Sequence, residues 1–239
     1  MTEPLKNAVV LLTGAGGGIG SALTEALLAA GTAEIISAGR SHPPPHARVR
    51  EETVDIADPA ALRTLAERHA ERVTMVIACA GVNANQRLFT PGFEAAARRD
   101  MEVNCFGLLH LATAFAPAMQ ARGSGLFVHL LTFLSHVNLP LMAGYCVSKA
   151  AAHSLTQALR AELARSGVRV CGVYPAVVDT AMSRAIAGPK LAPAELAQAV
   201  VRAIESGAED VYPGVADAVY RQFLADPKTA ERRMAARLP

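Results

Sequence analysis

Residues 7–31 have the sequence NAVVLLTGAGGGIGSALTEALLAAG, in which an apolar run, a glycine-rich turn and an amphipathic segment follow one another. The run Asn7–Thr13 has no alternating polar positions, which is typical of a strand buried on both faces of a parallel sheet. Leucines and alanines recur at helical spacing after Gly20, and the pattern stops at Gly31, since glycine is common at the C-terminal end of a helix. This stretch predicts a strand, a tight turn and a helix.

Such a glycine turn is suited to phosphate, because the backbone can approach the ligand and the helix start offers free N–H groups and a positive dipole end. The glycines Gly14, Gly18 and Gly20, with Gly16 and Gly17 between them, do not match the spacing of the general three-glycine dinucleotide pattern. The alternative interpretation is a turn that only closes a tight connection.

Arg40 follows the second expected strand, Glu34–Ala38, at the position where a carboxylate would bind the ribose hydroxyls of NAD. A guanidinium there suits the 2′-phosphate of NADP, so the sequence favours NADP(H), although Arg40 as a solvated charge is the alternative. The segment HPPPH that follows, residues 42–46, is expected to be a rigid loop. Its two histidines are interpreted as solvated rather than metal-bound.

Alternation of apolar runs with helical patterns continues along the chain and predicts an α/β protein with a Rossmann-type doubly wound parallel sheet in three αβα layers. No composition break divides it, so we expect a single domain, 1–239, with a cofactor half of about 1–125 and a catalytic and substrate half of about 126–239. The further strands are expected at residues 50–56, 73–78, 126–131, 168–174 and 210–212, with helices at 58–72, 93–120, 145–167 and 193–206 and a polar helical tail whose arginines are interpreted as a solvated face.

Tyr145 and Lys149 lie four residues apart, one turn apart on the same face of the expected helix. A phenol has a reference pKa of about 10, so it accepts a proton at neutral pH only if its anion is stabilised. An ammonium about 4 Å away provides an interaction of the required size at an effective dielectric near 20. The pair therefore predicts an acid–base site, and a plain amphipathic helix face is the alternative.

Composition limits the possible partners. The formal net charge is +2, which predicts neither nucleic acid nor an anionic membrane surface as a partner. Residues 1–8, MTEPLKNA, lack the pattern of a signal peptide, and no apolar run approaches the length of a membrane span. The four cysteines are widely spaced, which suggests neither a metal site nor a disulfide framework. The cytoplasm is the expected location.

In combination these features resemble the short-chain dehydrogenase/reductase family over essentially the whole chain. The family's glycine motif resembles Thr13–Gly20, TGAGGGIG, and its adenine-site aspartate resembles Asp55. Its helix asparagine is similar to Asn104 and its Tyr-x-x-x-Lys pair to Tyr145 and Lys149. Its turn after the sixth strand resembles residues 174–176, with Asp179 and Thr180 beyond it.

The resemblance implies that Tyr145 is the acid or base, that Lys149 lowers its pKa and holds the nicotinamide ribose, and that Asn104 anchors a water linking Lys149 to solvent. It also implies a homodimer or homotetramer and no metal. The residues expected to contact NADP(H) are Gly14, Gly16, Gly18, Ile19, Gly20, Arg40, Asp55, Ile56, Ala80, Gly81, Tyr145, Lys149, Pro175, Val178 and Thr180.

Three positions depart from the family pattern. Thr132 stands where the family has a serine that orients the substrate oxygen; it keeps the hydroxyl but adds a methyl group, and Ser135 is the second candidate for this role. The run 78–81, ACAG, lacks an amide that commonly ties neighbouring strands together. Ala176 replaces a glycine.

Three functions are compatible with these residues. The first is an NADP(H)-dependent oxidoreductase that interconverts a carbonyl and an alcohol with Tyr145 as acid or base; apolar residues at 134–142 favour an apolar substrate. The second is a non-catalytic protein of the same fold that binds NADP(H) as a sensor or scaffold. The third is a lyase or epimerase that retains the cofactor.

Overall fold

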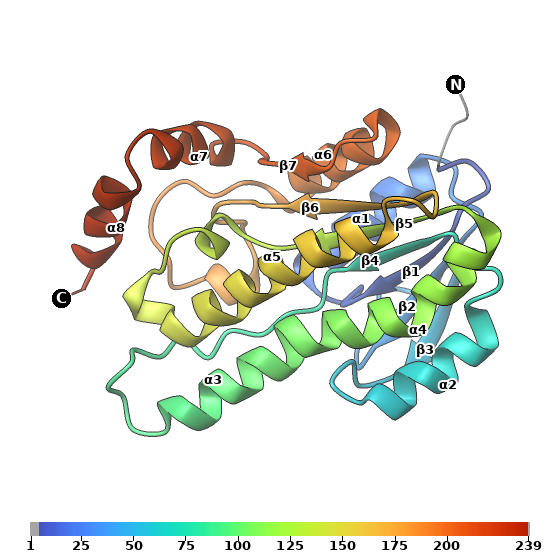
Figure 1. Cartoon of the computed structure of the whole chain (residues 1–239), viewed down its shortest axis with the longest axis horizontal. Coiled ribbons are helices and arrows are strands. Elements are labelled where there is room, and N and C mark those ends of the chain that lie inside the picture. Colours follow the sequence, from blue (N-terminus) through green and yellow to red (C-terminus); the bar gives the residue numbers. More distant parts are fainter. Residues whose placement is uncertain (1–4, 239) are drawn as a thin grey trace.

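Residues 5–238 are described by the computed structural model, in which seven parallel strands form one sheet (Figure 1). The strands are β1 (Val9–Thr13), β2 (Glu34–Gly39), β3 (Val49–Thr53), β4 (Met75–Ala78), β5 (Gly125–Leu130), β6 (Val168–Val173) and β7 (Asp210–Val211). The α-helices are α1 (Gly18–Ala29), α2 (Pro59–His69), α3 (Phe93–Met101), α4 (Gly107–Arg122), α5 (Ala143–Leu163), α6 (Pro193–Ser206), α7 (Ala216–Ala225) and α8 (Pro227–Ala235).

The strand order is β3-β2-β1-β4-β5-β6-β7, and every neighbouring pair is parallel. The chain therefore winds outward in one direction from β1 to β3 and in the other from β4 to β7. The switch between β1 and β4 opens a crevice at the carboxyl ends of the strands, where ligands of such sheets bind. The predicted doubly wound α/β fold is confirmed.

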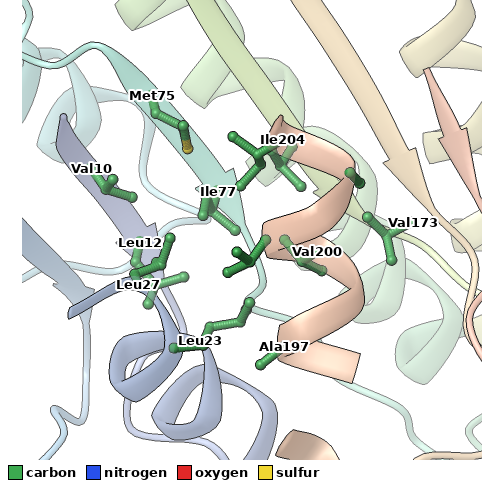
Figure 2. Close-up of a cluster of buried hydrophobic side chains, with 14 of the residues drawn as sticks. Val10, Leu12, Leu23, Leu27, Met75, Ile77, Val173, Ala197, Val200 and Ile204 are labelled. Carbon is green, nitrogen blue, oxygen red and sulfur yellow. The ribbon is translucent and has the colours of Figure 1, made fainter. Parts of the chain in front are cut away.

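Alternate residues of each central strand supply two separate apolar cores, because successive side chains of a strand point to opposite faces. Val10 and Leu12 of β1 belong to the core formed with α1 and α6, whereas Leu11 belongs to the core formed with α2 and α4. Figure 2 shows the first core, in which Leu23 and Leu27 of α1 face the side of the sheet that α6 also covers. Each fully buried aliphatic side chain contributes about 1.5–3 kcal/mol relative to exposure.

The connection between β2 and β3 confirms the loop that the sequence predicts at residues 42–46. Residues 40–48 form a loop with no helix, and residues 43–45 are prolines that a helix interior does not accommodate. The third strand is shorter than predicted: β3 ends at Thr53, so Asp55 lies beyond the strand. The other strand boundaries differ from the prediction by one or two residues.

The predicted long helix over 93–120 is interrupted. A π-helical turn, η1 (Glu102–Phe106), lies between α3 and α4. Asn104 is at its centre, and a π-turn is where a side chain that needs other partners interrupts the regular helical ladder. Figure 1 shows α3, α4 and α5 covering one face of the sheet.

The polar tail forms α7 and α8 at one end of the molecule (Figure 1). Aromatic rings attach α7 to the segments after β5 and β7. Tyr212, which follows β7, stacks on Tyr220 of α7 with ring centroids 4.0 Å apart, and the ring of His136, in the segment after β5, lies 4.9 Å from that of Tyr220. Tyr212 and His136 are also hydrogen-bonded, 3.2 Å apart. Within residues 5–238, none of the helices has the length and apolarity that crossing a membrane requires. The organisation as one domain stays a prediction.

Candidate active site

A cleft of about 670 Å³ lies at the carboxyl ends of the strands, at the switch between β1 and β4. The glycine turn forms one wall, the loop after β2 and residues 54–57 form one end, and the start of α5 forms the other. Of the predicted site residues, the lining contains Gly14, Gly18, Ile19, Gly20, Arg40, Asp55, Ile56, Ala80, Gly81, Tyr145, Lys149, Pro175 and Thr180.

The glycine turn leaves room for a ligand because side chains are absent where backbone segments approach. Gly14 has φ +70°, and a Cβ there would lie 2.8 Å from the backbone of Ala80. A Cβ at Gly20 would overlap the carbonyl oxygen of Gly14. Helix α1 begins at Gly18 with no side-chain cap and no acidic residue in its first turn. Its first N–H groups are therefore available to an anion in the cleft, which fits the pyrophosphate of a dinucleotide.

The other predicted cofactor residues surround this turn. Arg40 and Asp55 line the cleft at the ends of β2 and β3, where the adenosine part of a dinucleotide would lie. Thr180 closes the opposite wall, since a Cβ at Gly18 would lie 3.2 Å from its methyl group. Val178 is placed differently: its side chain is buried in the core on the α1 and α6 side.

Tyr145 and Lys149 line the inner end of the cleft, and Thr132 is buried beside Tyr145 rather than in the lining. Thr132 follows β5; its hydroxyl donates to the carbonyl oxygen of Pro175 at 3.3 Å and lies close enough to the phenol of Tyr145 to influence its pKa. Lys149 lies one turn further along α5, with its ammonium 6.0 Å from the centroid of the Tyr145 ring. The ammonium is buried and donates a 2.7 Å hydrogen bond to the carbonyl oxygen of Leu130. A phenol and an ammonium thus meet where the cleft ends, with a hydroxyl beside the phenol.

The electrostatics of Tyr145 differ from the expectation. Burial raises the pKa of the phenol above its ordinary value, and the neighbouring hydroxyl of Thr132 acts in the opposite direction without reversing the shift. Lys149 is not among the causes of this shift, and its ammonium is directed to Leu130, so the lowering of the Tyr145 pKa by Lys149 stays a prediction. Burial also lowers the pKa of Lys149 to about 8, while the neighbouring Cys79 raises it.

Asn104 is a satisfied core amide. Its Oδ1 accepts from the N–H of Val82, and its Nδ2 donates to the carbonyl of Val82 and to Oγ of Ser148, each at 2.9 Å. These bonds connect the π-turn both to the segment after β4 and to α5. A Cβ at Gly81 would lie 3.2 Å from Oδ1 of Asn104 and 3.7 Å from Nζ of Lys149, so both side chains lie next to Gly81.

Residues 78–81 lack the side-chain amide that commonly ties neighbouring strands together, and a threonine hydroxyl makes such a connection instead. The buried hydroxyl of Thr13 accepts from the N–H groups of Cys79 and Ala80, at 3.1 and 3.2 Å. It thereby joins the ends of β1 and β4 on either side of the cleft. Ser135, the second candidate for the substrate hydroxyl, is buried, and its Oγ has no hydrogen-bond partner among the described residues.

An apolar cluster adjoins Tyr145 on the side away from the glycine turn. Its buried members are Leu139, Met142 and Cys146, and Tyr145 itself packs against them. Met234 of α8 packs against the same cluster. The sequence did not predict this contact of Met234, since a single methionine among the arginines of a polar helix does not indicate what it packs against. Nor did the sequence predict that Arg98, Arg99, Glu102 and Met182 line the cleft.

No group of three or more histidine, cysteine or acidic side chains within residues 5–238 is arranged to hold a metal ion. The four cysteines are free thiols. The cleft offers an anion site at a helix start, an arginine at one end, and a phenol and an ammonium at the other.

Known proteins are similar to this chain over most of its length. The sequence profile of the short chain dehydrogenases matches residues 8–190. An uncharacterized oxidoreductase of Staphylococcus saprophyticus is 29% identical over 217 residues, which is 84% of this chain and 92% of that protein. One from Staphylococcus haemolyticus is 28% identical over 222 residues, 87% of this chain and 95% of that protein.

Among solved structures, a short chain dehydrogenase from Burkholderia cenocepacia in complex with NADP superposes with a TM-score of 0.91 and 37% identity, covering 96% of this chain and 98% of that one. A gluconate 5-dehydrogenase of the same organism has a TM-score of 0.76 at 23% identity, covers 87% of this chain and 93% of its own, and supports the fold alone. Sequence, fold and cleft agree, and the chain belongs to the short chain dehydrogenase family of oxidoreductases.

Proposed function

We propose that the chain is an NADP(H)-dependent oxidoreductase that interconverts a carbonyl and an alcohol. The observation that carries this proposal is the pair of Tyr145 and Lys149, one helical turn apart at the inner end of the cleft, with the hydroxyl of Thr132 beside the phenol. A substrate oxygen bound there meets a proton donor and a second hydroxyl at once. The uncapped start of α1 supports the cofactor part of the proposal.

Each residue has a distinct task in this reaction. Bound NADP(H) supplies or accepts the hydride. Tyr145 exchanges the proton with the substrate oxygen, and Thr132 orients that oxygen by a hydrogen bond. Burial raises the pKa of Tyr145, so the phenol is protonated at neutral pH and has a proton to donate when a carbonyl is reduced. Lys149 stabilises the phenolate that remains, and Asn104 positions the start of α5 through Ser148.

The preference for NADP(H) over NAD(H) is supported by Arg40, which lines the cleft after β2 where no carboxylate is present. The Burkholderia cenocepacia short chain dehydrogenase, which is 37% identical, was solved in complex with NADP. An apolar substrate is supported by the cluster of Leu139, Met142 and Met234 beside Tyr145. We also propose a homodimer or homotetramer in the cytoplasm, and light scattering on the purified protein tests the assembly.

Oxidation of NADPH by purified protein tests the proposed reaction when a panel of aliphatic and aromatic ketones is supplied and the cofactor's absorbance is followed. Tyr145→Phe is expected to lower kcat by about 10²–10⁴-fold, the usual contribution of a positioned acid or base. Tyr220→Phe is the control, because Tyr220 belongs to the aromatic stack of α7 rather than to the cleft. A Tyr145→Phe variant with full activity would remove the proposed role.

Two other outcomes distinguish the alternatives. Tight cofactor binding without turnover of any ketone, together with indifference to Tyr145→Phe, would indicate a binding protein. Conversion of a substrate with no net change in the cofactor would indicate a lyase or epimerase.

A further inference from the structure

The loop after β2 is packed directly on the glycine turn. A Cβ at Gly16 would lie 2.7 Å from Oγ of Ser41 and 2.9 Å from the backbone nitrogen of His42, closer than real side chains approach. The glycine is therefore required by the loop at this position. Arg40 and Ser41 both line the cleft, so the path of this loop decides where the guanidinium lies.

Arg40 itself is not held by the rest of the protein. It is exposed, and it makes no hydrogen bond or ion pair with any residue in the described range 5–238. A long, solvated side chain loses conformational entropy when it binds a phosphate, so its affinity depends on how well its backbone is fixed. A neighbouring residue that holds the backbone of Arg40 in place would therefore strengthen phosphate binding.

His42 is that neighbour, and it is hydrogen-bonded at both ring nitrogens. Nδ1 lies 2.9 Å from Oγ of Ser37, a fully buried residue of β2. Nε2 lies 3.3 Å from Oγ1 of Thr53, the last residue of β3. The expectation that His42 is merely solvated is wrong: the imidazole is half-buried and bridges two strands immediately after Arg40 and Ser41.

We propose that His42 is a positioning residue that sets the preference for NADP(H) by fixing the loop that carries Arg40. The inference rests on the proposed function, and it assigns the discrimination to a residue that makes no contact with the 2′-phosphate itself. The bridge to Ser37 and Thr53 prevents the loop from moving away from Gly16, which keeps the guanidinium over the ribose end of the cleft.

Isothermal titration of the full-length protein with NADP⁺ and with NAD⁺ tests the inference. His42→Leu removes both hydrogen bonds and is expected to weaken NADP⁺ binding by about tenfold while changing the Kd for NAD⁺ less than twofold. His42→Asn keeps a polar group at the position of Nδ1 and is expected to recover most of the loss. His46→Leu, at the exposed end of the same loop, is the matched control.

A double-mutant cycle with Arg40→Ala shows whether His42 acts through the arginine. If it does, His42→Leu no longer changes the ratio of the two dissociation constants once Arg40 is removed. A role limited to stability would lower the melting temperature and weaken both cofactors equally, which overturns the inference. An unchanged ratio in His42→Leu overturns it as well.

The wild-type titrations distinguish this inference from the proposed function. A wild-type protein that binds NADP⁺ no more tightly than NAD⁺ overturns the inference but leaves carbonyl and alcohol chemistry possible with either cofactor. A wild-type protein that binds neither nucleotide overturns both.

Discussion

Nδ2 of Asn104 lies 2.9 Å from Oγ of Ser148, and this hydrogen bond joins the π-turn to the helix that carries Tyr145 and Lys149. Ser148 in turn donates to the carbonyl of Tyr145 at 2.7 Å. The Asn104 side chain is also hydrogen-bonded to the backbone N–H and carbonyl of Val82, so it connects the segment after β4 with α5. The extra residue of the π-turn directs the amide inward.

Replacing Asn104 tests this connection. Asn104→Ala removes the side chain that pairs with the backbone N–H and carbonyl of Val82, at a cost of about 1–3 kcal/mol for each group left unsatisfied. We expect a lower melting temperature and a lower kcat, because α5 is no longer fixed relative to the cleft. Thr113→Ala on the exposed side of α4 is the control. An Asn104→Ala enzyme with normal kcat would show that α5 is positioned without the asparagine.

The hydroxyl of Thr132 gives a second prediction. Thr132→Val keeps the shape of the side chain but removes the hydroxyl beside Tyr145, and we expect kcat to fall by about 10²-fold, as for loss of one preorganised donor. Thr132→Ser retains the hydroxyl and is expected to stay within a few-fold of wild type. Steady-state kinetics with one ketone and NADPH compare the two.

Thr132 also has a structural part, which the same variants control. Its hydroxyl donates to the carbonyl of Pro175 and accepts from the N–H of Leu134, both at 3.3 Å. If Thr132→Val lost activity only in proportion to unfolded protein, seen by circular dichroism, the hydroxyl would serve the fold rather than the reaction.

Met234 is expected to influence which substrates fit. It packs on the cluster of Leu139, Met142 and Cys146, so α8 covers the apolar side of Tyr145. Met234→Ala creates space there, and we expect kcat/KM for bulky ketones to rise relative to small ones by about tenfold, the usual effect of small changes in an apolar pocket. Leu224→Ala is the control, since Leu224 is 60% exposed on α7. An unchanged ranking of ketones would place the substrate elsewhere.

The sequence was sufficient for the parts of the fold that local rules dictate. Continuous apolar runs such as Asn7–Thr13 belong to strands covered on both faces, and the glycine turn could be predicted because Gly14 and Gly20 have no room for side chains. Tyr145 and Lys149 could be paired because helical spacing fixes their common face.

What the sequence did not show depends on contacts between distant segments. The π-turn at Asn104 exists because of Val82 and Ser148, which lie 22 and 44 residues away. The bridge from His42 to Thr53 became visible only with the register of β2 and β3. The raised pKa of Tyr145 follows from burial, and a four-residue spacing says nothing of burial.

His129 predicts a loss of stability in acid. It lies in β5, is 1% exposed, and its Nδ1 is 2.8 Å from Oγ1 of Thr156. Because that hydroxyl donates its only proton to the carbonyl of Ala152, Nδ1–H of the histidine must be the donor. Burial, reinforced by Lys149 and Arg160, lowers the pKa of His129 to about 3.

The unfolded chain takes up this proton near the ordinary pKa of 6.5, whereas the folded protein does not until about 3. The unfolded state therefore binds more protons between these values, and the free energy of unfolding falls as the pH falls from 6.5. One such group lowers the free energy of unfolding by about 2 kcal/mol at pH 5 relative to neutral pH. His136, whose pKa burial lowers to about 4, adds to the same trend.

Urea titrations at pH 7 and pH 5 measure this difference, with His129→Asn and the exposed control His46→Gln compared with wild type. Asparagine retains an N–H donor for Thr156 but does not titrate, so the variant is expected to lose less stability between the two pH values than wild type does. His46→Gln is expected to lose as much as wild type. Should His129→Asn lose as much too, the acid sensitivity would arise from other groups, with the partly buried His136 and His153 the first to replace.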